Sequence, residues 1–422
     1  MITMVEETAT HKAVNERRVL PVGWHWITVR DIGPVTDGDW ILNSDYASEG
    51  VRLLQVGDVG LGKFTNKSHR FISAHRAREL GCTFLQPNDI LISRMPDPIG
   101  RACLLPDLGY PAITAVDVSI WRPSADFADR RYLAYYLISS EWLAKVKSLA
   151  SGATRARISR SNLENLAIPF PPLSEQKRIA AILREQMAAV ERARAAAQAQ
   201  LAAALQLPTA YLRQVFAGDE AHRWPKPRLA DIVREAQGGF ASGERDPDGV
   251  VQLRMNNVTT RGHFDWSSFI RVPASEGTIA TYSLASGDVL FNNTNSTELV
   301  GKTALFEAYD EPVVFSNHFT RLRARADKLE PAFLASWLQY QWQRRLFADI
   351  CNQWIGQSAV QRDKLLSLDM PLPPLPEQKR IAAILREQMA AVERARVIEE
   401  AQLDAIDKLP ATLLRRAFNG EL

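Results

Sequence analysis

The chain has 422 residues and a formal net charge of +3. It is therefore long enough for roughly two to four domains, and too nearly neutral for charge alone to indicate a nucleic-acid partner. Its three cysteines lie far apart and its seven histidines are scattered, which argues against a disulfide framework and predicts no metal site. No apolar run approaches the roughly 20 residues that cross a bilayer. We therefore expect a globular, cytoplasmic protein without a membrane partner.

A segment of 24 residues occurs twice with one difference. Residues 171–194 read PPLSEQKRIAAILREQMAAVERAR and residues 373–396 read PPLPEQKRIAAILREQMAAVERAR. Ala, Leu, Glu, Gln, Lys and Arg dominate, and all favour a helix. Ser174 is expected to cap the first copy, and Pro208 is expected to break or kink the helix that follows. The sequence therefore predicts a long helix from about residue 174 to 206, and a second one near the C-terminus.

Each predicted helix has a narrow apolar stripe, because its large apolar residues recur at three- and four-residue steps. Two matching stripes predict an antiparallel coiled-coil pair and a surface on which partner proteins dock. The residues assigned to this packing are Ile179, Ile182, Leu183 and Val190 in the first copy, and Ile381, Ile384, Leu385 and Val392 in the second.

The segments before the two helices are less alike but share a skeleton of short motifs. Residues 29–32 (VRDI) correspond to 229–232 (LADI), 88–92 (NDILI) to 287–291 (GDVLF), and 99–101 (IGR) to 300–302 (VGK). A turn followed by a β-prone run is typical of a strand. The sequence therefore predicts an α+β fold with a pseudo-twofold internal repeat, in which two mixed α/β domains are joined and separated by the two helices.

Several motifs give the chain a resemblance to a known family. They are the duplicated helix starts IPFPPLSEQKRIAAIL at 168 and MPLPPLPEQKRIAAIL at 370, SGATRARISRSNLENL at 151–166, LLQVGDVGLG at 53–62 and FNGEL at 418–422. In this order the chain resembles the specificity (S) subunits of type I restriction-modification systems over essentially its whole length. The resemblance implies the segments 1–19 (N-terminal), 20–172 (target recognition domain 1), 173–218 (central helical region), 219–374 (target recognition domain 2) and 375–422 (C-terminal helical region).

The same resemblance implies a function and partners. Each target recognition domain would read one half of an asymmetric, bipartite site in double-stranded DNA. The helices would dock two methyltransferase (M) subunits, and restriction (R) subunits would join them. S-adenosylmethionine, ATP and magnesium are expected on those partner subunits, and no cofactor is expected in this chain.

Candidate DNA-binding residues in the first domain lie mainly in a basic segment, 142–163, which contains no acidic residue. Backbone phosphates attract such a segment, and arginine also binds guanine edges. The alternative is an ordinary solvated basic face. The candidates are Lys145, Lys147, Arg155, Arg157 and Arg160, together with Arg94 and Arg101 beside a proline-rich loop.

In the second domain, amide side chains are the main candidates. Gln357 and Gln361 would contact adenine edges, and Arg362 would hold a phosphate. A polar run after a predicted strand adds Asn292, Asn293 and Asn295, although asparagine also favours simple turns. Lys302 is a further candidate.

Catalytic motifs are incomplete, so no catalytic residue is assigned. The glycine-rich run 57–63 resembles a phosphate-binding loop, but Phe64 stands where serine or threonine must hold magnesium. Glu175 and Lys177 lack the partner carboxylates of a nuclease. The prolines at 171–172 and 373–374 are followed by leucine, unlike an amino-methyltransferase motif. The leading hypothesis is a non-catalytic DNA-specificity subunit, and the alternatives are a self-sufficient methyltransferase or nuclease, or a coiled-coil scaffold.

Overall fold

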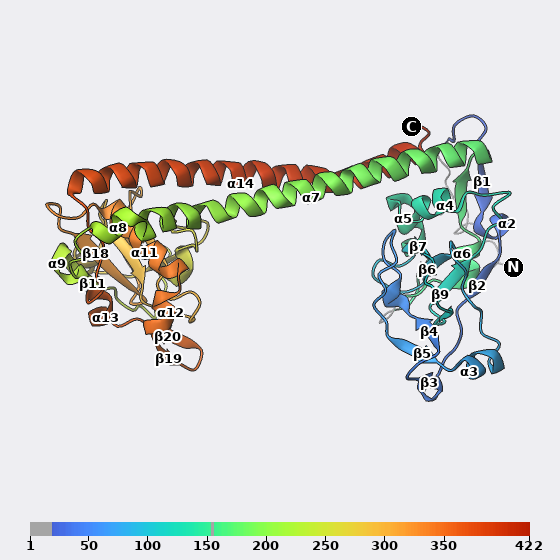
Figure 1. The fold of residues 1–422 in the computed structure, drawn as a ribbon, viewed down its shortest axis with the longest axis horizontal. Helices are drawn as coiled ribbons and strands as arrows, with labels where there is room; N and C mark the ends of the chain where they lie inside the picture. Colours follow the sequence, from blue (N-terminus) through green and yellow to red (C-terminus); the bar gives the residue numbers. More distant parts are fainter. Residues whose placement is uncertain (1–18, 153–155) are drawn as a thin grey trace. The chain divides into compact units, whose positions relative to one another are not determined.

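The computed structural model describes residues 19–152 and 156–422, which form two compact units (Figure 1). Unit 1 contains the described residues up to Ala197 together with Gln402–Leu422, and unit 2 is Gln198–Ala401. Two long helices, α7 (Leu173–Ala217) and α14 (Leu375–Phe418), are each divided between the units. Each unit therefore contains one mixed domain, the start of one long helix and the end of the other.

Unit 1 is built on two small four-stranded sheets. The first is antiparallel, in the order β2 (Val35–Asp37), β9 (Val118–Trp121), β6 (Ile90–Ser93) and β7 (Ala102–Leu104). The second has the order β3 (Tyr46–Ala47), β5 (Arg70–Ile72), β4 (Val51–Leu54) and β8 (Ala112–Thr114), with β4 and β8 parallel. A separate antiparallel pair joins β1 (His25–Thr28) to β10 (Ala167–Phe170).

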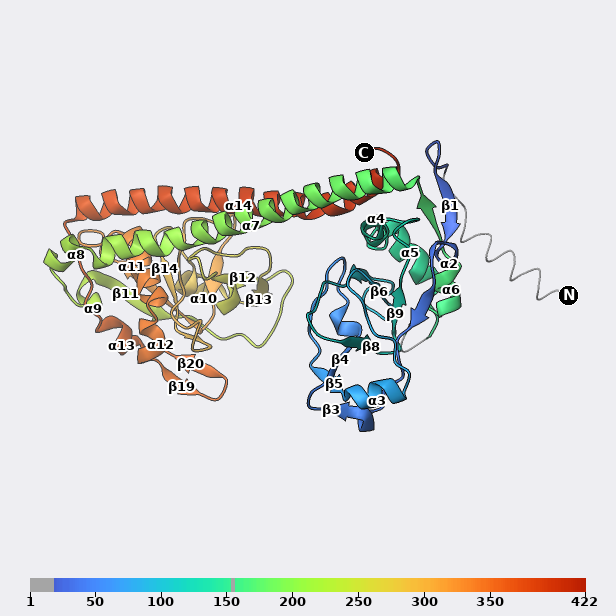
Figure 2. The same ribbon diagram turned by 45° about the vertical axis from the view of Figure 1, so that its right-hand side comes forward.

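Short helices pack around the sheets of unit 1, some of them near α7 and one at the opposite end of the mixed domain (Figure 2). They are α2 (Val29–Ile32), α3 (Ala74–Glu79), α4 (Arg130–Tyr136), α5 (Ser140–Ser148) and α6 (Arg160–Glu164). Asp129 caps α4 and Ser159 caps α6 through backbone N–H groups of the first turn, as expected for these residue types. One hydrophobic core extends from Ile92 of β6 through Leu133 of α4 to Leu183 of α7.

Unit 2 repeats this plan. Its first sheet has the order β11 (Val233–Gly238), β18 (Phe319–Ala324), β14 (Val289–Asn292) and β16 (Thr303–Leu305), and its second has the order β13 (Ile270–Val272), β12 (Val250–Leu253) and β17 (Val313–Phe315). A third sheet, β15 (Thr294–Asn295), β20 (Gln357–Ala359) and β19 (Asn352–Trp354), has no sheet counterpart in the described part of unit 1. The helices are α8 (Asp219–Arg223), α9 (Leu229–Ile232), α10 (Glu276–Tyr282), α11 (Pro331–Gln343), α12 (Leu346–Ile350) and α13 (Arg362–Leu366).

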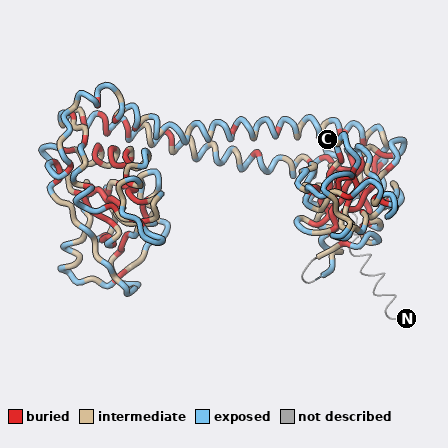
Figure 3. The backbone as a smooth tube through the Cα atoms, turned by 60° about the horizontal axis from the view of Figure 1, so that its bottom comes forward, coloured by how far each residue is buried: buried red, intermediate tan, exposed pale blue. Residues whose placement is uncertain are grey.

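The predicted correspondences between the two halves are confirmed. Residues 29–32 and 229–232 form the short helices α2 and α9, and the two β-prone runs form β6 and β14. Figure 3 shows buried residues gathered inside each mixed domain, whereas the long helices have only scattered buried positions. The α+β class, with two mixed domains and two long helices, is as predicted.

The long helices run antiparallel beside each other within each unit. In unit 1, Val190 and Ala197 of α7 pack on Ile406 of α14. In unit 2, Leu212 near the end of α7 shares a core with Leu385 near the start of α14. This confirms the predicted antiparallel pair.

Pro208 does not break the first helix, so of our two expectations for this residue only a kink remains. Helix α7 continues through it to Ala217, because Leu212 and Phe216 beyond the proline are buried in the core of unit 2. Tertiary packing outweighs the lost backbone hydrogen bond. Ser174 lies inside α7 rather than at its cap, since the helix begins at Leu173.

A buried glutamine in the repeated segment fastens each mixed domain to its helix. Gln176 accepts a hydrogen bond from the Asp129 backbone N–H at 2.9 Å and donates to the Pro171 carbonyl at 2.8 Å. Gln378 is equivalent, accepting from the Glu330 N–H at 2.9 Å and donating to the Pro373 carbonyl at 2.8 Å. The start of α4 or α11 is thereby held against the start of α7 or α14.

Candidate nucleic-acid interface

Arg94, the residue after β6, is joined by backbone hydrogen bonds to two other segments of unit 1. The Arg94 backbone N–H donates to the Asp117 carbonyl at 2.9 Å, and the Arg94 carbonyl accepts from the Ile158 N–H at 3.2 Å. Ser151 and Arg157 pair across the loop that precedes Ile158. Three segments distant in sequence are therefore joined at Arg94.

Unit 2 has the same backbone frame with different side chains. The Asn293 N–H donates to the His318 carbonyl at 3.0 Å, and the Asn293 carbonyl accepts from the Val360 N–H at 2.9 Å. Val360 follows the β19–β20 hairpin (Asn352–Ala359), which stands where unit 1 has the loop containing Ser151 and Arg157. We call these two equivalent arrangements the recognition frames. They join the same positions but present different chemistry.

The recognition frame of unit 1 is ionic. Arg94 lies 3.3 Å from Asp37, Arg160 lies 3.7 Å from the other oxygen of Asp37, and Arg157 lies 2.8 Å from Asp117. Burial lowers the pKa of the Arg94 guanidinium, and the charge of Asp37 opposes that shift. Arg94 is buried, so it supports the cluster, whereas Arg157 and Arg160 reach the surface. Arg160 also lies 3.7 Å from Glu164, so three guanidinium groups face three carboxylates in this cluster.

The other cations predicted in the first domain have different surroundings. Lys145 is engaged with Glu141 at 2.8 Å and lies 4.4 Å from the centre of the Trp26 ring. Lys147 is exposed on the last turn of α5. Arg155 lies outside the described residues. Lys147 is thus better placed than Lys145 to meet a phosphate.

Arg101 and Lys302 occupy equivalent buried positions. The Arg101 guanidinium donates to the carbonyls of Val59 at 2.6 Å and Val56 at 2.8 Å. The Lys302 ammonium donates to the carbonyls of Met255, at 3.2 Å, and Val258. Burial lowers the pKa of both cations. Their DNA contact stays a prediction, and their present role is to hold the loops after β4 and β12.

The asparagine run of unit 2 is an internal network. Asn292, fully buried, donates to the carbonyls of Thr294 at 3.1 Å and His318 at 2.9 Å, and accepts from Asn295 at 2.6 Å. Asn293 is half-buried and donates to the Thr320 hydroxyl at 3.0 Å. These contacts resemble the turn alternative more than a set of free base readers, and DNA contact by these asparagines stays a prediction.

The β19–β20 hairpin and the start of α13 form the exposed part of the unit 2 frame. Gln357 is exposed on the hairpin, and Gln361 and Arg362 are exposed at the start of α13. Sequence reasoning missed Trp354 and Ile355, whose exposed fractions at the hairpin tip are 58% and 106%. An apolar pair in a sequence normally indicates core, so pattern alone did not reveal this tip.

The predicted packing residues of the long helices divide into two groups. Six of them are buried: Ile179, Leu183, Val190, Ile381, Leu385 and Val392. Ile182 is half-buried, and Ile384 is 40% exposed. Ile182 and Ile384 are therefore the members of the stripe that remain accessible from outside.

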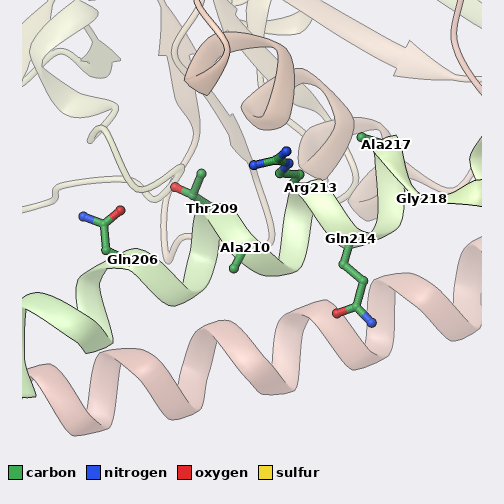
Figure 4. A pocket seen from close by; sticks show the side chains of 7 residues that line it. All are labelled: Gln206, Thr209, Ala210, Arg213, Gln214, Ala217 and Gly218. Carbon is green, nitrogen blue, oxygen red and sulfur yellow. The ribbon is translucent and has the colours of Figure 1, made fainter.

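The hollows of unit 2 lie beside the long helices α7 and α14. One hollow at the end of α7 is lined by Gln206, Thr209, Ala210, Arg213, Gln214, Ala217 and Gly218 (Figure 4). Arg213 is the only ionisable side chain in that lining. Within the described residues, no group of three histidine, cysteine or acidic side chains is placed to hold a metal ion. None of the helices in that same part of the chain is long and apolar enough to span a membrane.

Comparison with known proteins identifies the class. The family model for the type I restriction modification DNA specificity domain matches residues 21–197 and 229–402. The StySPI specificity subunit of Salmonella potsdam is 25% identical over 439 residues, covering 96% of this chain and 90% of that protein. The EcoKI specificity subunit of Escherichia coli is 24% identical over 397 residues, covering 90% and 83%. The class is thus a DNA-specificity protein.

The chain belongs to the family of type I restriction-modification specificity subunits, which recognise DNA sequence and are not themselves catalytic. A putative MjaX specificity subunit of Methanocaldococcus jannaschii is 32% identical over 170 residues, but that match spans only 40% of either chain. Two solved structures share the fold. One, from a study of complex assembly in a type I system, has a TM-score of 0.75 at 20% identity, covering 96% of this chain and all of that one. The other, the HsdS subunit of Thermoanaerobacter tengcongensis, has a TM-score of 0.65 at 19% identity, covering 96% and 99%.

Proposed function

We propose that the chain reads a bipartite, asymmetric site in double-stranded DNA, one half with each recognition frame. The observation that carries this proposal is the equivalence of the two frames in backbone and their difference in side chains. Unit 1 presents Arg157 and Arg160 beside carboxylates, whereas unit 2 presents amides and an apolar tip. Guanidinium groups favour guanine edges and phosphates, and amides favour adenine edges. Two different half-sites are the expected consequence.

Two identical docking surfaces follow from the repeated helix segment. The two copies of the 24-residue repeat differ only at Ser174 and Pro376 and are the same at exposed positions such as Arg184 and Arg386, although the mixed domains have diverged. Identical surfaces suit two copies of one partner, and the proposed partner is the methyltransferase subunit. Restriction subunits would complete the nuclease. S-adenosylmethionine, ATP and magnesium would be bound by those partners.

A matched pair of variants tests the division of labour between the frames. Arg160 and Arg362 are the first residues of α6 and α13, and their side chains are 49% and 61% exposed. The chain is purified with its methyltransferase partner, and methylated positions are mapped by sequencing that detects modified bases. Arg160→Ala should weaken or relax one half-site, and Arg362→Ala the other. An arginine–guanine contact corresponds to about 1–3 kcal/mol of discrimination.

The outcome distinguishes the proposal from its rivals. If both variants change the same half-site, the assignment of one half to each unit is wrong. If the wild-type complex methylates without sequence preference, the chain acts only as a scaffold. Methylation by this chain without any partner would contradict its non-catalytic role.

A further inference from the structure

The β19–β20 hairpin is held rigidly at its base. Strand β20 pairs with β15 through Thr294 and Asn295, and the Thr297 and Ser358 hydroxyls lie 2.8 Å apart. The buried Asn292 amide holds β15 in place, because it donates a hydrogen bond to the Thr294 carbonyl and accepts one from the Asn295 amide. The base of the hairpin is thus held by Asn292 and Asn295, two of the asparagines that the sequence had suggested as base readers.

The tip of the hairpin is apolar and exposed. Trp354 pairs with Gln357, so Ile355 and Gly356 form a two-residue turn, and Gly356 has a φ of +77° that favours glycine. Ile355 is exposed along its full side chain, so it contributes nothing to the core of unit 2. A large aliphatic group placed in water on a rigid support requires an external partner to gain any burial.

The hairpin contains no charged residue. Its sequence, NQWIGQSA at 352–359, has three amide side chains that are all exposed. The amides can contact phosphates or base edges, but an aliphatic side chain such as Ile355 cannot bind a phosphate, so its contribution to DNA binding would come from apolar groups on base edges. The major groove is about 12 Å wide and admits a two-stranded ribbon, and thymine alone presents a methyl group there.

We propose that Trp354 and Ile355 read thymine methyl groups in the major groove of the half-site bound by unit 2, while the neighbouring amides read the paired adenines. This inference rests on the proposed function of the recognition frames. It assigns at least one A·T pair to that half-site. It also makes Ile355 a specificity-determining residue that no pattern of charge or polarity had indicated.

The test measures equilibrium binding of the complex with its methyltransferase partner to its mapped DNA site. Each thymine of the site is replaced singly by uracil, which pairs normally but lacks the methyl group. One or two replacements in a single half-site should weaken binding about fourfold each, the loss expected for one buried methyl group. The variant Ile355→Ser should bind the thymine and uracil duplexes equally at the one position whose methyl group Ile355 contacts, and should keep any response that depends on Trp354.

A control variant keeps the result interpretable. Val22 of unit 1 is 103% exposed, so Val22→Ser removes an equally exposed aliphatic group and should leave the response to uracil unchanged. If no uracil replacement weakens binding, or if Ile355→Ser leaves the response intact, the methyl contact is refuted. In either case, specific methylation of both half-sites would leave the proposed function standing. Loss of all sequence preference in the wild-type complex would refute both.

Discussion

The buried glutamines at the helix starts give a prediction whose size follows from the structure. Removing Gln378 leaves the Glu330 N–H and the Pro373 carbonyl without their partner. A buried polar group left unsatisfied costs about 1–3 kcal/mol. The third contact, to the Lys328 carbonyl at 2.9 Å, belongs to an exposed residue and is replaced by water at small cost. Gln378→Ala should therefore destabilise unit 2 by about 3 kcal/mol.

The repeat provides a second copy of the same experiment. Gln176 makes the equivalent two contacts in unit 1, so Gln176→Ala should destabilise unit 1 by a similar amount. Hydrogen exchange measured by mass spectrometry, with the full chain in its complex, reports on the two units separately. Each variant should speed exchange in the first turn of α4 or α11 and in the adjoining sheet, with the other unit unchanged.

Two further variants separate hydrogen bonding from packing. Gln378→Met keeps nearly the same volume but lacks the polar atoms, so it should retain most of the destabilisation. Lys379→Ala changes the exposed neighbour and should have no effect. If Gln378→Met exchanges like the wild type, the hydrogen-bond reasoning is refuted. If either alanine variant loosens both units equally, the glutamines do not act locally.

Two other predictions concern docking and pH. The double variant Ile182→Asp, Ile384→Asp alters the accessible members of the stripe and should abolish co-purification of the methyltransferase without unfolding either unit. The control is Val397→Asp, which lies just beyond the repeat and is 53% exposed. Intact co-purification of the double variant would refute this docking surface. Burial raises the pKa of Cys103 to about 12 and that of Cys82 to about 11. Unfolded thiols ionise near pH 9 while these stay protonated, so unit 1 should lose stability as the pH rises above about 9. Iodoacetamide at pH 9 should label the half-buried Cys351 before Cys82 and Cys103, and uniform labelling of a folded sample would contradict this order.

Much of the fold could be predicted from the sequence because the two halves of the sequence repeat the same pattern of motifs. The repeated segment fixed the helix starts, and motifs such as IGR and VGK identified equivalent positions in the mixed domains. The length of α7 was underestimated, since the packing of Phe216 that carries the helix past Pro208 has no local signal.

The candidate site was harder to predict, for a chemical reason. The groups of arginine, lysine and asparagine that bind DNA also bind backbone carbonyls, and Arg101, Lys302 and Asn292 are engaged in this second way. Only the burial of the side chain distinguishes a residue that binds backbone carbonyls from one that is free to bind DNA, and burial is not visible in the sequence. Conversely, Ile355 has a side chain typical of a core but lies at an exposed tip. The carboxylates of Asp37 and Asp117, which position the arginines of unit 1, are distant in sequence from the basic segment.

The recognition frames are joined to their variable parts largely through main-chain atoms, and side chains add the Arg157–Asp117 pair in unit 1 and the Thr297–Ser358 pair in unit 2. The Arg94 and Asn293 carbonyls accept from Ile158 and Val360 whatever side chains these positions hold. A hairpin of different length or sequence can therefore replace the one at Asn352–Ala359 without repacking the sheet beneath it. Under the proposed function, exchange of the hairpin residues Asn352–Ala359 would change the half-site read by unit 2 while the rest of that unit folds as before.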